Sequence, residues 1–144
     1  MPVNVSIDVT PGTVPANPQT PIAVSYGNLS TAPNTPLISL QPQESKGSVK
    51  LRFAKGSAKE GTVRWKLPPG WIFVSGSSVF SPRQGSAPNS WGASTNPQGN
   101  VLMVPFDFSG QPEGTQWSWD HQYKVQKSSS GVAYDVDPEI ENDN

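Results

Sequence analysis

Prolines and glycines interrupt this chain along its whole length, and they constrain its fold more than any other feature. The 144 residues include 16 prolines and 13 glycines, and the longest stretch that lacks both is 115–130. Both residues are unfavourable in the interior of a helix. Read as a helix, 115–130 would place an indole, a carboxylate, an imidazole and an ammonium group on one face, which is not an amphipathic stripe. The sequence therefore predicts a chain without helices.

Apolar and polar residues alternate between these breakers with the period of two that is typical of half-buried strands. The alternating segments are 3–9, 22–26, 49–53, 63–67, 102–108, 117–125 and 132–136, with short apolar runs at 37–40 and 71–74. Short strands with turn residues between them predict a β-sandwich of about eight or nine antiparallel strands. The length fits one all-β domain over residues 1–144.

Two tryptophans flank a Pro-Pro-Gly turn. Trp65 alternates in phase with Val63 and Leu67 and opposite two cations, so we expect it in the core. Trp71 follows Pro69-Gly70, which suits a type II turn, and we expect it to cap one end of the core.

Three segments carry a resemblance to a known fold. SVKLRF ends at Phe53, Trp65 follows twelve residues later, and Tyr123 lies two residues before Val125 in DHQYKV. Over residues 48–137 this pattern resembles an immunoglobulin-like β-sandwich. The resemblance implies that these segments are the second, third and sixth strands of that fold, with Phe53 and Val125 at the positions of its two disulfide cysteines. It implies no activity, because this fold hosts many unrelated functions.

The composition excludes several kinds of chemistry. The chain has no cysteine, so it has neither a disulfide nor a thiolate nucleophile or metal ligand. His121 is the single histidine, it lies on the apolar face between Trp119 and Tyr123, and no serine has a nucleophile-elbow sequence around it. We therefore expect His121 to be a core residue and the chain to have no catalytic site, cofactor or metal.

Opposite charges are segregated along the chain, although its net charge is only −1. Seven of the ten Lys and Arg residues lie between 46 and 66, and five of the eleven acids lie in the last ten residues. The cations that we expect to point away from the core are Lys50, Arg52, Arg64 and Lys66. The acids of the tail 135–144 that would project to one side of an extended chain include Asp135, Asp137, Glu139 and Glu141. We predict that this tail pairs with the four cations, within one molecule or between neighbours; a solvated tail is the alternative.

The stretch 81–100 is predicted to be a long loop, and such loops are often functional. Trp91 stands in it among small polar residues, where it either pins the loop or contacts a partner. The candidate contact residues are Trp91, Arg83, Asn89, Asn96 and, at a strand end, Trp117.

These patterns predict a non-catalytic structural or protein-interaction module that contacts a protein partner or assembles with copies of itself. The alternative is a carbohydrate-binding module in which exposed tryptophans stack on sugar rings. The balanced charge gives no reason to expect nucleic acid as a partner, and no apolar run is long enough to insert in a membrane. The N-terminus lacks a basic and then apolar leader, which leaves open the cytoplasm, a virion or other particle, or the mature part of an exported protein.

Overall fold

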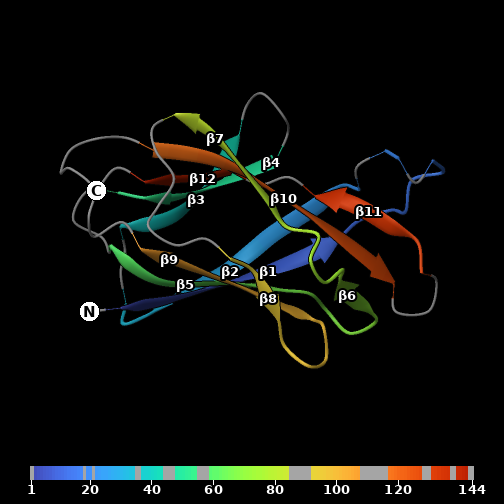
Figure 1. Ribbon diagram of the computed structural model, residues 1–144, viewed down its shortest axis with the longest axis horizontal. Helices are drawn as coiled ribbons and strands as arrows, with labels where there is room; N and C mark the ends of the chain where they lie inside the picture. The colour runs from blue at the N-terminus through green and yellow to red at the C-terminus, as the bar shows by residue number, and fades with distance from the viewer. Residues whose placement is uncertain are drawn as a thin grey trace.

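The structure of the chain is a computed structural model (Figure 1). It describes residues 2–17, 19–20, 22–34, 37–43, 48–54, 59–84, 92–107, 117–127, 131–136 and 139–142, and the side chains within these ranges except those of 41–43, 48–50, 79–84, 117–120 and 139–142. Every regular element in these ranges is a β-strand, so the prediction of an all-β chain is confirmed. Within the same ranges, no helix is present that could cross a bilayer.

The first layer is a five-stranded sheet with the order β2-β1-β5-β9-β8. Its strands, in chain order, are β1 (Val3–Pro11), β2 (Val24–Ala32), β5 (Glu60–Lys66), β8 (Ser94–Thr95) and β9 (Val101–Asp107). In β1 the even-numbered residues face outward and the odd-numbered residues from Val3 to Val9 are buried. The alternation predicted from the sequence is therefore what holds this strand on the core.

The second layer has the order β11-β10-β12-β4-β3, with β6 and β7 also paired to β10. Its strands are β3 (Ile38–Gln43), β4 (Ser48–Phe53), β6 (Trp71–Phe73), β7 (Val79–Gln84), β10 (Trp117–Lys127), β11 (Ala133–Val136) and β12 (Glu139–Asn142). Figure 1 shows β10 as a long strand, and β6, β7, β11 and β12 all pair with it.

Strands β11 and β12 continue one another as partners of β10. Val136 of β11 pairs with Tyr123, and Glu139 of β12 pairs with Asp120. Glu139 follows Val136 by three residues, and Asp120 precedes Tyr123 by three residues, as antiparallel pairing requires. Strands β11 and β12 therefore have the same register against β10.

The two layers share one hydrophobic core. The first layer contributes residues such as Ile7, Trp65 and Val104, and the second contributes Phe53 and Tyr123, all of them 0–1% exposed. Rings meet across the core, as between Phe53 and Phe106, whose centroids are 4.7 Å apart. Trp65 is 0% exposed, which confirms its predicted place in the core, and Trp71 is half-buried against the edge of the core.

The prediction of antiparallel strands throughout is wrong at two places. Strand β1 pairs with β5 in parallel, and β12 pairs with β4 in parallel. Alternation along a strand reports which face is buried and carries no information about the direction of the neighbouring strand. Gly61 permits the first of these pairings, because a Cβ atom there would overlap the backbone of Val3.

The number of strands and two boundaries also differ from the prediction. The described ranges contain twelve strands rather than eight or nine. Residues 81–84 of the predicted loop belong to β7, whose Pro82 obscures its strand pattern, and Ser94–Thr95 form β8. The predicted tail is part of the second layer, since Asp135 lies in β11 and 139–142 form β12.

The strand order differs from the one that the immunoglobulin resemblance implies. In that fold the third and sixth strands are neighbours in one sheet, opposite the second strand. Here β5 lies in the first layer, whereas β4 and β10 are both in the second. Trp65 and Tyr123 therefore face each other across the core, with ring centroids 6.2 Å apart.

Candidate functional site

A cluster of polar aromatic groups surrounds His121 inside the core. Strand β10 alternates so that His121, Tyr123 and Val125 face inward, and all three are 0–1% exposed. The His121 ring lies 5.1 Å from the Tyr123 ring and 6.2 Å from the Trp65 ring. The expectation that His121 is a core residue is confirmed.

Burial controls the ionisation of this cluster. Desolvation lowers the pKa of His121 from 6.5 to about 3, so the folded protein holds a neutral imidazole at physiological pH. The Nε2 atom of His121 lies 3.2 Å from the Ser78 Oγ atom, which is a hydrogen bond whose direction depends on the tautomer. Burial, followed by the neighbouring Tyr26, raises the pKa of Tyr123 well above its usual value of 10.0.

Two members of this cluster are absent from the sequence-based candidates. Ser78 and Tyr26 come from segments 43 and 97 residues away from the groups they contact, and the hydroxyl oxygens of Tyr26 and Tyr123 are 3.3 Å apart. Tyr26 belongs to a recognisable alternating set, but nothing in that set indicates a hydroxyl partner. The cluster lies inside the core, and its imidazole has no exposed surface from which to reach a substrate.

The structure brings part of the predicted charge pairing together by backbone register. Glu139 pairs with Lys50, and Glu141 pairs with Arg52, along the parallel strands β12 and β4. The side chains of Lys50, Glu139 and Glu141 lie outside the described residues, as does Asp137 altogether.

The remaining members of the predicted charge set lie elsewhere. The carboxylate of Asp135 is 3.0 Å from the Lys124 ammonium group, its register partner on β10. Arg64 and Lys66 are exposed on β5, in the other layer, so they do not form one face with Lys50 and Arg52. Assignment to layers depends on pairing between distant segments, which alternation alone cannot reveal.

For most of the predicted contact residues, the side chain lies outside the described part of the structure. Trp91 and Asn89 lie outside the described residues, and Arg83 and Trp117 are placed only as backbone positions in β7 and β10. Asn96 is described, and its side chain is engaged within the turn that joins β8 and β9.

The Asn96 side chain organises this turn through three hydrogen bonds. Its Oδ1 atom accepts from the backbone amide of Val101 at 3.0 Å, and its Nδ2 atom donates to Asn100 Oδ1 at 2.8 Å and to Gln98 Oε1 at 3.1 Å. These bonds give Asn96 a structural task in the turn.

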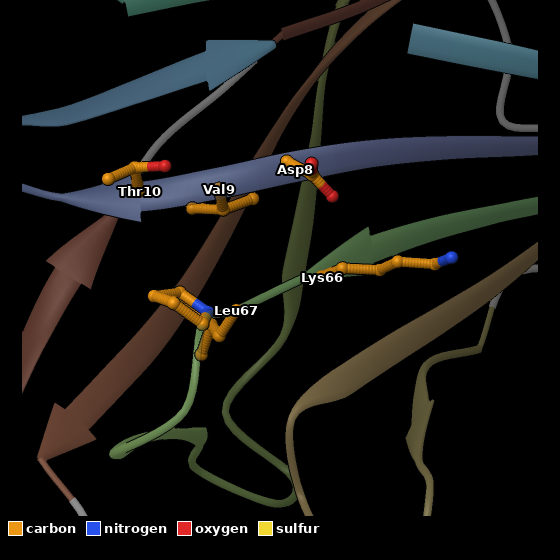
Figure 2. A pocket seen from close by; sticks show the side chains of 6 residues that line it. Asp8, Val9, Thr10, Lys66 and Leu67 are labelled. Atoms are coloured by element: carbon orange, nitrogen blue, oxygen red, sulfur yellow. The ribbon is translucent and has the colours of Figure 1, made fainter. Parts of the chain in front are cut away.

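A shallow hollow lies where β1 passes the end of β5 (Figure 2). Its volume is about 180 Å³, and its lining residues are Asp8, Val9, Thr10, Lys66, Leu67 and Pro68. Asp8 and Lys66 are register partners on the parallel strands, and Figure 2 shows them on neighbouring ribbons. The volume is below the roughly 300–1,000 Å³ of most small-molecule sites. We therefore assign no ligand to this hollow.

Comparison with known proteins gives little guidance. No protein-family model matches the chain, and no curated protein is similar to it. Among solved structures, the chain is similar to an inclusion body protein, PixA, from Burkholderia cenocepacia J2315, with a TM-score of 0.49 and 10% sequence identity over 99% of this chain and 96% of that one. A likeness of this size is too weak to assign a fold or a function.

Proposed function

We propose that this chain is a non-catalytic structural or protein-interaction module that associates with copies of itself. The observation that supports the non-catalytic part of this proposal is the burial of His121, the single histidine of the chain, which is 0% exposed. Histidine is the residue most often used for general acid–base catalysis, and a candidate must come within hydrogen-bond reach of its substrate. In this protein the imidazole instead packs against Trp65 and Tyr123.

The distribution of charge supports a structural role for the C-terminal strand. The register of β12 against β4 makes Glu139 and Glu141 the backbone partners of Lys50 and Arg52, and the carboxylate of Asp135 on β11 pairs with the Lys124 ammonium group on β10. These pairings lie within one molecule. Contacts between molecules are therefore expected on the outer faces and the strand edges rather than through an exchanged tail.

The mass of the purified native protein tests this proposal. Sedimentation velocity over a series of concentrations should reveal a discrete species heavier than the 15.4 kDa chain. A protein that stays a single chain at every concentration would contradict self-association. If the monomer bound one or more sugars from a soluble panel, the carbohydrate-binding alternative would replace the proposal of self-association.

A further inference from the structure

The first layer packs one face on the core and leaves the other face in solvent. On β1 and β5, which are neighbours in this layer, the buried residues are odd-numbered and the even-numbered residues lie on the outer face. Asn4, Thr10, Arg64 and Lys66 are exposed there, as is Ser30 on β2. This outer face is therefore open to contact with another molecule.

Charge is divided between these two strands. Where β1 and β5 pair, the outward charges are one acid on β1, Asp8, and two cations on β5, Arg64 and Lys66. Glu60 and Asp107 lie beyond this stretch, at the end of the layer where β5 begins and β9 ends. The middle of the face is therefore negative on its β1 side and positive on its β5 side.

The two cations of β5 are not neutralised within the described part of the molecule. Neither Arg64 nor Lys66 forms an ion pair there, and the Asp8 carboxylate accepts a hydrogen bond from Asn28 Nδ2 at 2.8 Å. On the outer face of the second layer, by contrast, the exposed cation Lys124 is already paired with an acid of the neighbouring strand. The first layer therefore presents opposite charges that are available to a partner.

A second copy of the same face has the complementary pattern of charge. Asp8 is the register partner of Lys66, and Ser6 is the register partner of Arg64 (Figure 2 shows Asp8 and Lys66 on neighbouring ribbons). A two-fold axis above the face, parallel to the strands and midway between β1 and β5, carries each residue to a position over its register partner. Asp8 of each copy then faces Lys66 of the other, so one contact brings two pairs of opposite charges together.

We propose that the outer face of the first layer is the self-association surface of this protein, and that a second copy packs its own first layer on it about this two-fold axis. Such an isologous contact stacks two sheets with their strands aligned. Charge complementarity across the contact fixes the orientation of the two copies. This inference rests on the self-association proposed above and names its surface and its symmetry.

Charge reversal on the full-length chain tests this contact. Lys66→Glu places two acids across the two-fold axis and Asp8→Lys places two cations there, so each variant alone should associate about tenfold or more weakly than the native chain. An equimolar mixture of the two variants should regain the association, because every acid then faces a cation of the other chain. The chain with both changes should regain it as well.

Lys124→Glu is the matched control, because it makes the same change of charge at an exposed site on the outer face of the other layer. It should leave association unchanged. Sedimentation velocity gives the dissociation constants, and circular dichroism checks the fold of each variant.

Acetylation of the unmodified protein gives a second measurement that does not depend on any variant folding. Acetic anhydride should modify Lys66 more slowly at high protein concentration than at low concentration, and the rate at Lys124 should not change. Mass spectrometry of the peptides measures both rates.

Two results would overturn the assignment. If the protein associates but the charge reversals behave like Lys124→Glu, the mixture fails to regain association, or Lys66 reacts at one rate throughout, then association uses another surface. If the protein is a monomer at every concentration, both the assignment and the proposed function fail.

Discussion

Acid should destabilise this protein through His121, and the effect can be worked out from its burial. The folded pKa is about 3, against 6.5 for an ordinary histidine. Because the folded pKa is lowered, the stability contributed by the neutral imidazole is fully present above about pH 6.5 and is lost as the pH falls toward 3. One pKa unit corresponds to about 1.4 kcal/mol, so lowering the pH from neutral to about 4.5 should cost about 3 kcal/mol.

Urea unfolding at the two pH values measures this loss, and His121→Gln separates it from the titration of carboxylates. Carboxylates contribute equally to both proteins, so the free energy of unfolding of the variant should depend on pH less steeply than that of the native chain, by about 3 kcal/mol over the same interval. Proton NMR gives an independent measurement, because the chain has one histidine and therefore one set of imidazole signals. In the folded protein these signals should not titrate between neutral pH and about pH 4.5. A titration midpoint near 6.5 would refute the burial of His121 and this reasoning with it.

Three further predictions concern the fold. Trp65→Ala should lower the free energy of unfolding by about 3–5 kcal/mol, because it leaves a cavity between the two layers, and a loss below about 1 kcal/mol in urea unfolding would contradict its full burial. Gly61→Ala should also be strongly destabilising because its Cβ atom would overlap the backbone of Val3, whereas Gly92→Ala, with no atom within 4 Å of the new Cβ, should have little effect in the same thermal denaturation assay. Deleting residues 139–144 removes a strand that lies between β10 and β4, so the truncated chain should melt at a lower temperature than the full chain at both low and high salt; unchanged melting would show that β12 contributes nothing to the fold.

The exposed ion pairs are expected to matter much less than these backbone contacts. Lys124 and Asp135 have side chains that are 46% and 45% exposed, and such pairs contribute about 0–1 kcal/mol. The same reasoning suggests that β12 is held chiefly by its two rows of backbone hydrogen bonds.

The sequence by itself determined the class of structure and the buried face of most strands. The spacing of prolines and glycines left no room for helices, and the alternation around Val63 and Leu67 placed Trp65 in the core. The same alternation in β10 placed His121 and Tyr123 inward. These features are local, because a strand with one buried face must repeat its apolar residues every second position.

Only the tertiary structure decided which strands are neighbours. The parallel pairing of β1 with β5, the position of β12 between β10 and β4, and the contacts of Ser78 and Tyr26 with the core cluster all join segments far apart in the chain. The division of the four cations between two layers has the same origin. A two-residue period indicates which face of a strand a side chain lies on. The choice and direction of the neighbouring strand depend instead on how distant segments of the chain pack together around one core.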